Sequence, residues 1–249
     1  QLIHASDTEL PSLKQWALQL GIDLSVPRVA IIIELNSNST DCQHDNQALK
    51  QVMHLLQHPL RDNLIAMTSL TQLVILKPAL ADGQQFNPER ESQHIDKLLK
   101  RLPANMQIKL HIALGHYFSG DLGISYSYRT AKETLDIGKK YHPEKSKYVY
   151  QDYSLQVLLS GLRHHWRGHA LTGPYQKLLE ADNNQQLQKT LAAYLQHMGD
   201  LQACANSLFI HRNTLRYRLD NIQNIPQINL HNFNGLLSLY LGQIIHQPD

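Results

Sequence analysis

The chain has 249 residues, of which 42% are hydrophobic and 18% are charged. This length and composition exclude a disordered chain and leave room for two globular domains. The formal net charge of +2 excludes a strongly basic chain, so any surface for nucleic acid must be a local patch.

Cysteine content and hydropathy also argue against a disulfide-rich protein, a cysteine-based metal site and a membrane protein. The chain contains only Cys42 and Cys204, too few for a disulfide framework or a four-cysteine metal site. No signal peptide is visible, and no apolar run approaches the roughly 18 residues of a membrane-spanning helix. We therefore expect a cytoplasmic protein with no membrane partner. Because the first residue is Gln1 rather than Met, we also expect a fragment of a longer chain.

The first predicted element is a helix at residues 8–20. Its apolar stripe consists of Leu13, Trp16, Ala17 and Leu20, and Gly21 ends it. We assign residues 1–25 to a connector helix.

Residues 26–152 have the pattern of an α+β domain. Short β-branched runs predict strands, and apolar stripes at helical spacing predict helices. In chain order these are a strand at 28–35, a helix at 48–56, a hairpin of strands at 63–67 and 72–76, a helix at 91–102, a strand at 108–115, a helix at 124–141 and a strand at 148–150. The order β-α-β-β-α-β-α-β favours a sheet covered by helices.

This region resembles a GGDEF-type domain, the fold of diguanylate cyclases. The resemblance rests on the element order, on KLHIALGHYFSG before the helix at 126–138 and on KYVYQDY after it. A cyclase of this family needs two Gly and an acidic pair in its hairpin. Here the corresponding turn consists of Ser69, Leu70, Thr71, Gln72 and Leu73. The family's metal-binding position corresponds to Glu34 or Asn36, which leaves at most one carboxylate for a chemistry that needs a divalent metal. The resemblance therefore implies a degenerate GGDEF-like domain, and we expect no enzyme, no catalytic residues and no cofactor.

Other catalytic or metal-binding patterns give no stronger candidate. The chain has no phosphate-binding loop of the G-x-x-x-x-G-K type and no G-x-S-x-G elbow. The pairs His54 with His58 and His165 with His169 have a spacing that can hold zinc, but neither pair has an evident third ligand. We expect no metal site.

Residues 153–249 are predicted to be helical. Pro174 is expected in the first turn of a helix that ends at Ala181. The next helix has an inner face of Leu187, Leu191, Tyr194, Leu195 and Met198. A last amphipathic helix, which either closes the bundle or pairs two subunits, carries Phe233, Leu236, Leu237, Tyr240, Leu241 and Ile244.

A helix-turn-helix is predicted at residues 200–223. Apolar residues at 201, 204, 205 and 208 indicate one short helix, and those at 215, 219 and 222 indicate a second. Ile210 is expected to fill the corner between the two helices. In such motifs the second helix is offered to the major groove of DNA.

The outward face of the second helix follows from a rotation of about 100° per residue. With Leu215 towards the core, Asn213 and Tyr217 point almost directly away from it. They are flanked by Thr214, Arg216, Asp220 and Asn221, while Arg212 and Arg218 lie on the two borders. Arg, Asn and Thr side chains can read base edges, and Arg on a border suits phosphates. The candidate DNA-binding residues are His211, Arg212, Asn213, Thr214, Arg216, Tyr217 and Arg218.

Two features qualify this interpretation. Asp220 lies four residues after Arg216 and can pair with it. An Arg-rich second helix also occurs in ordinary bundles, so the motif could instead dock a protein.

The run IHRNTLRYRL at 210–219 resembles the purine-catabolism-regulator type of C-terminal helix-turn-helix, which ends many bacterial regulators. The resemblance covers about 50 residues well and, more loosely, about the last 90. One departure is Phe209, where many relatives place Gly. Because a bulky residue does not enter the φ > 0 region freely, we expect a turn of different shape.

The arrangement of connector, degenerate GGDEF-like domain and terminal helix-turn-helix resembles the carbohydrate diacid regulator family of transcriptional activators. The resemblance implies double-stranded promoter DNA as partner and control of genes for glucarate, galactarate and glycerate. It also implies a sugar diacid effector bound by a missing upstream domain. Because one recognition helix covers half a site, we expect a homodimer. The alternative is a GGDEF-like nucleotide-binding protein or cyclase with a helical accessory tail.

Overall fold

The computed structural model describes residues 3, 8–36, 42–56, 62–79, 86–101 and 109–246. The chain forms two compact units, residues 1–157 and residues 158–249, each described below by itself. The finer division predicted from the sequence, into 1–25, 26–152 and 153–249, stays a prediction.

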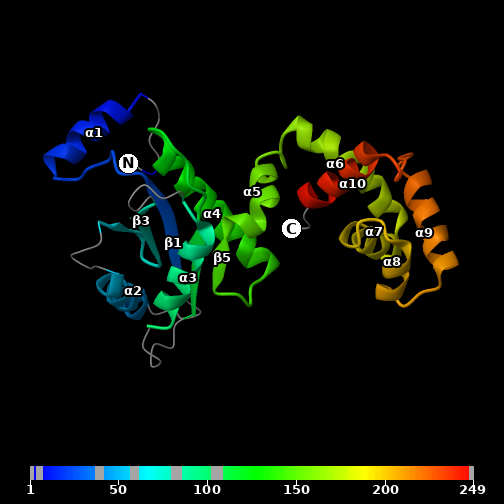
Figure 1. The fold of residues 1–249 in the computed structure, drawn as a ribbon, viewed down its shortest axis with the longest axis horizontal. Helices are drawn as coiled ribbons and strands as arrows, with labels where there is room; N and C mark the ends of the chain where they lie inside the picture. The colour runs from blue at the N-terminus through cyan, green and yellow to red at the C-terminus, as the bar shows by residue number, and fades with distance from the viewer. Residues whose placement is uncertain are drawn as a thin grey trace. The chain divides into compact units, whose positions relative to one another are not determined.

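The first unit is built on a five-stranded sheet with the order β2-β3-β1-β4-β5 (Figure 1). The strands are β1 (Arg28–Asn36), β2 (Leu64–Ser69), β3 (Gln72–Pro78), β4 (Lys109–Leu114) and β5 (Lys147–Val149). All neighbouring pairs are antiparallel except β4 and β5, which are parallel. The predicted order of strands and helices is confirmed.

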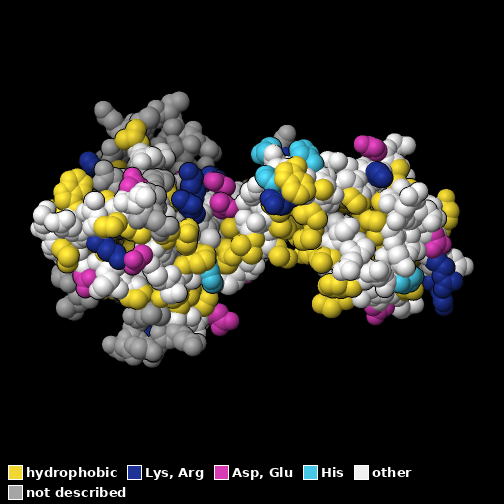
Figure 2. All heavy atoms as spheres, turned by 90° about the horizontal axis from the view of Figure 1, so that it is seen from above, with side chains coloured by type: hydrophobic (Ala, Val, Ile, Leu, Met, Phe, Trp, Pro, Cys, Tyr) yellow, Lys and Arg dark blue, Asp and Glu magenta, His cyan; other side chains and the backbone are white. Residues whose placement is uncertain are grey.

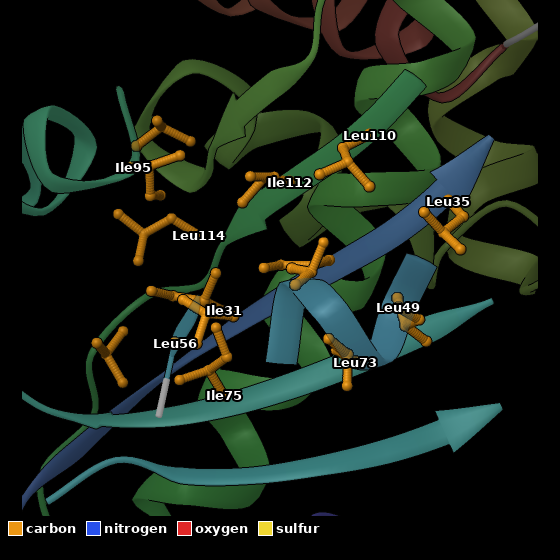
Figure 3. Close-up of a cluster of buried hydrophobic side chains, with 14 residues drawn as sticks. Ile31, Leu35, Leu49, Leu56, Leu73, Ile75, Ile95, Leu110, Ile112 and Leu114 are labelled. Carbon is orange, nitrogen blue, oxygen red and sulfur yellow. The ribbon is translucent and has the colours of Figure 1, made fainter. Parts of the chain in front are cut away.

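Helices cover both faces of this sheet because the central strand β1 is apolar on both sides. Its odd-numbered residues Ile31, Ile33 and Leu35 pack with α2 (Cys42–Leu56) and α3 (Pro88–Leu99). Figure 3 shows this layer, in which Leu49 and Leu56 of α2 and Ile95 of α3 lie among the side chains of the strands. The even-numbered residues Ala30 and Ile32 pack with Tyr128, Ala131 and Leu135 of α4 (Gly123–Tyr141) on the other face.

Helix α1 (Leu10–Gln19) precedes the sheet and ends as predicted at Gly21, which has φ +72°. Its predicted apolar stripe is partly wrong. The helix buries Leu10 and Ala17, whereas Trp16 and Leu20 are exposed. The two buried residues are seven positions apart and so lie on the same side of the helix. Only this narrow side of α1 is buried, and the neighbouring positions Trp16 and Leu20 remain in solvent.

The second unit consists of helices around one core. Its helices are α5 (Ser154–Ser160, which begins in the first unit), α6 (Trp166–Ala181), α7 (Gln186–Gln196), α8 (Leu201–Ser207), α9 (Arg212–Asn224) and α10 (Phe233–Ile245). The core contains Tyr175, Leu178, Leu187, Leu191, Tyr194, Cys204, Ala205, Leu215, Leu219, Ile222, Leu230 and Leu239. Helix α10 packs on α6 and buries Leu239, Ile244 and Ile245, so it closes the bundle.

Three sequence-based expectations in this unit are wrong. Pro174 lies inside α6, which begins at Trp166 because the His165 side chain caps it. Proline there removes a single backbone donor from a helix that packing holds together. Met198 lies beyond the end of α7 in a left-handed conformation and is exposed, and Phe233 at the first position of α10 is also exposed.

Candidate nucleic-acid interface

Helices α8 and α9 form the predicted helix-turn-helix. Asp200 caps α8: its Oδ1 accepts hydrogen bonds from the backbone N–H groups of Gln202 (2.9 Å) and Ala203 (3.0 Å). His211 caps α9: its Nδ1 accepts from the N–H of Asn213 at 3.2 Å. These caps set the residues at which the two helices begin.

We expect the Asp200→Ala variant to lose about 0.5–2 kcal/mol of stability, because two N–H groups at the start of α8 lose their acceptor. Asp200→Ser should recover most of the loss, since its hydroxyl can take the same position. Thermal unfolding followed by circular dichroism measures this, with Asp220→Ala as the control on an exposed position of α9. An Asp200→Ala midpoint equal to that of the control would contradict the capping role.

The core side of α9 is the one predicted. Leu215, Leu219 and Ile222 are buried, and they pack with Cys204 and Ala205 of α8. Three buried apolar residues spaced over about two turns fix the rotation of α9 about its axis.

The opposite side of α9 faces solvent. His211, Arg212, Asn213, Thr214, Arg216 and Tyr217 are exposed, and Arg218 is half-buried. Tyr217 has 66% of its surface exposed, a large fraction for an aromatic residue on a packed helix. The structure therefore places all seven candidate residues at one end of the second unit, outside its core.

Arg216 is available to a partner. Asp220 was expected to be able to pair with it, but these two described residues form no ion pair in the structure. The segment 201–219 contains three Arg and no Asp or Glu. Figure 2 shows basic side chains gathered at the end of the second unit where Figure 1 draws α9. This local charge suits a polyanion even though the chain as a whole is nearly neutral.

The turn between α8 and α9 corrects the prediction about Phe209. Phe209 does adopt a left-handed conformation, with φ +54°, as Gly would. Its N–H donates to the carbonyl oxygen of Asn206 (3.2 Å), and the N–H of Ile210 donates to that of Ala205 (3.0 Å). This pair of bonds is the Schellman motif that ends many helices. The turn thus keeps its usual shape, and Phe209 bears the strain.

In the described part of the first unit, the carboxylate that corresponds to the metal-binding position of a cyclase has other partners. Glu34 lies on the α4 face of the sheet, where its carboxylate accepts from Lys139 Nζ and from Gln72 Nε2, the latter at 3.3 Å. The side chain of Asn36, the other candidate metal position, lies outside the described residues. Because Lys139 neutralises Glu34, these residues do not fit a divalent metal. The hairpin turn instead exposes Leu70.

The two histidine pairs with zinc-binding spacing were not expected to bind metal. In the structure, one of these four histidines, His165, has another role. The Nδ1 of His165 caps α6 by accepting from the N–H of Arg167. His58 lies outside the described residues. Within the described ranges, no three His, Cys, Asp or Glu side chains come together as a metal site. No helix in the described part of the chain is long and apolar enough to cross a bilayer.

Comparison with known protein families agrees with both halves of this description. Residues 5–137, more than half of the chain, match the GGDEF-like domain family. Residues 187–245 match the PucR C-terminal helix-turn-helix domain.

Individual relatives match nearly the whole chain. The carbohydrate diacid regulator of Escherichia coli K12 is 41% identical over 97% of this chain and 62% of its own length. An uncharacterized protein of Haemophilus influenzae is 32% identical over 98% of this chain and 63% of its own. The proline-responsive transcriptional activator PutR of Bacillus subtilis is 23% identical over 90% of this chain and 55% of its own. The chain thus spans less than two thirds of the length of these relatives. It belongs to the GGDEF-like domain family and carries a PucR-type C-terminal helix-turn-helix domain.

Proposed function

We propose that this chain is part of a cytoplasmic transcriptional activator that binds promoter DNA and controls genes for the uptake and breakdown of sugar diacids. The observation that carries the proposal is the exposed face of α9, where three Arg outnumber the single Asp220, beside a fully packed core side. The identity to the E. coli carbohydrate diacid regulator supports the substrate class, with glucarate, galactarate and glycerate as the specific candidates. We place the effector in a domain upstream of this chain.

The roles of the α9 residues follow from side-chain chemistry. Arg216 and Asn213 are assigned to base edges, because guanidinium matches guanine and carboxamide matches adenine in the major groove. Thr214 and Tyr217 lie beside them and fill the groove. Arg212 and Arg218, at the two borders, are assigned to phosphates, and His211 stands at the N-terminus of α9, where the helix dipole favours an anion.

A homodimer is part of the proposal. One recognition helix reads only a few base pairs, so a specific operator needs two copies on half-sites one helical turn apart. The buried face of helix α10 packs on α6 within the same chain. We therefore assign the contact between subunits to other surfaces.

A gel shift with promoter DNA over a range of salt concentrations tests the proposal. We expect retardation of duplexes from upstream of sugar diacid genes and weaker binding to a scrambled duplex. The affinity should fall by orders of magnitude between about 50 and 200 mM salt, as counterions are released from the phosphates. The same weak affinity for both duplexes at every salt concentration would refute it.

The role of Arg218 gives a separate expectation. Arg218→Ala should weaken binding to all sequences alike and reduce the slope of log K against log salt by about 0.9, the share of one phosphate contact. Lys177→Ala, which removes one exposed positive charge from α6, is the matched control and should leave the slope unchanged. Equal slopes for all three proteins would remove Arg218 from the interface.

The alternative, a nucleotide-binding or cyclase activity, is tested by incubation with GTP and magnesium. The pairing of Glu34 with Lys139 predicts no product. Formation of a cyclic dinucleotide would overturn this interpretation of the first unit.

A further inference from the structure

Phe209 combines two unfavourable features at the start of the recognition helix. Its backbone is left-handed, which costs free energy for a residue with a Cβ and costs glycine nothing. Its ring is 95% exposed. Among the described residues, no ring or cation lies within stacking distance of it.

Within the ranges that the structure describes, the turn is held by contacts that do not involve the Phe209 ring. The neighbours Leu208 and Ile210 turn inward and pack on the core of the second unit, so the turn is already anchored without the Phe209 ring. The two hydrogen bonds of the turn use backbone atoms and would form equally well with glycine. An exposed apolar side chain alone is common at protein surfaces. An exposed apolar side chain on a residue with a strained backbone indicates contact with a binding partner.

The residues around Phe209 indicate the chemistry of its binding partner. Phe209 lies two residues before His211, the N-cap of α9, and three before Arg212, and both of these residues are exposed. Between Asp200 and Asp220 the chain has three Arg and no acidic residue, a local charge that suits a polyanionic partner. A large apolar ring beside phosphate-binding groups suits the deoxyribose face of a DNA strand.

We propose that Phe209 forms the edge of the DNA interface, with its ring against a deoxyribose of the strand that borders the groove entered by α9. This inference rests on the proposed function, since it needs DNA on α9. Because the contact is apolar and made to the backbone, it adds affinity on all sequences alike and adds nothing to the salt dependence.

The test compares Phe209→Gly, Phe209→Ala and a matched control in the full chain. The control is Gln227→Gly. Gln227 is exposed, has φ +57° and lies in the same bonding pattern, in which its N–H donates to the oxygen of Asn224 and that of Ile228 to Gln223. It follows the other end of the 13-residue helix α9, about 20 Å away.

We expect both glycine variants to unfold at an equal or higher temperature than the wild type, because each relieves a left-handed residue. Phe209→Gly and Phe209→Ala should bind operator and scrambled duplexes on the order of tenfold more weakly, the effect of losing about 55 Å² of buried apolar surface, with an unchanged salt slope. Gln227→Gly should bind as the wild type does.

Wild-type affinity of Phe209→Gly for a duplex that the wild type binds would overturn the inference while leaving the proposed function intact. Loss of transcriptional activation without loss of affinity would also overturn it, and would assign the ring to a protein partner. A wild-type chain that binds no DNA would instead refute the proposed function itself.

Discussion

Replacing Arg216 with alanine should weaken operator binding by about 1–3 kcal/mol, or roughly 5- to 150-fold, and should relax the preference at one base pair. The physical reason is that an exposed guanidinium without an intramolecular ion pair is available for two parallel hydrogen bonds to a guanine. Competition between operator duplexes with each base pair changed in turn measures both effects.

Two further variants separate base reading from charge. Arg216→Lys keeps the charge but loses the planar fork, so it should keep non-specific binding and lose the base preference. Arg167→Ala removes the same charge from an exposed position in α6, where the guanidinium stacks over Trp166 at 4.8 Å, and should change neither property. An unaltered base preference in both Arg216 variants would mean that another residue reads the operator.

Replacing Leu215 with alanine should destabilise the second unit by about 2–5 kcal/mol, the cost of emptying a packed apolar site. Leu215 is 1% exposed and packs in the core formed by α7, α8 and α9. Because small domains are stable by only about 5–15 kcal/mol, this loss should lower the unfolding temperature of the second unit and abolish DNA binding near its midpoint.

Scanning calorimetry of the full chain can follow the two units as separate transitions. Leu201→Ala, at the exposed first position of α8, is the control and should cost much less. A Leu215→Ala transition within about 1 kcal/mol of the wild type would place Leu215 outside the core and would reverse the face of α9.

Periodicity alone predicted much of the fold. The run RVAIIIEL at 28–35 is apolar at every position except Arg28 and Glu34, and it forms the central strand β1, which is buried on both faces. In α9 the leucine and isoleucine spacing fixed the buried face, and with it the outward positions of Asn213 and Tyr217. Both patterns predict structure well because every buried position along the strand or helix requires an apolar residue, so the signal is repeated several times.

Helix ends were predicted less well, because backbone hydrogen bonds override side-chain preference there. Phe209 and Met198 both follow the end of a helix. Both are held left-handed by hydrogen bonds that their own N–H and the N–H of the next residue donate to carbonyl oxygens of the preceding turn. The sequence shows an unsuitable side chain at each position but not the bonds that impose the conformation. Pro174 is a similar case, since packing of α6 against α10 keeps the helix continuous through a residue that usually begins one.

The assignment of α9 residues to bases and phosphates stays a prediction. Exposure shows which side chains are free to bind, whereas the operator decides which of them meet a complementary group. The sequence and the fold thus define a surface, and the choice among Asn213, Arg216 and Tyr217 as readers of sequence depends on DNA contacts.

Methylation protection of operator guanines by the bound chain tests the placement of α9 in the major groove most directly. Dimethyl sulfate modifies guanine N7, which lies in the major groove and accepts from arginine. We predict protected guanines in two half-sites about 10 base pairs apart, with one protection in each half-site lost in Arg216→Ala. Tight operator binding that leaves every guanine N7 as reactive as in free DNA would contradict the account.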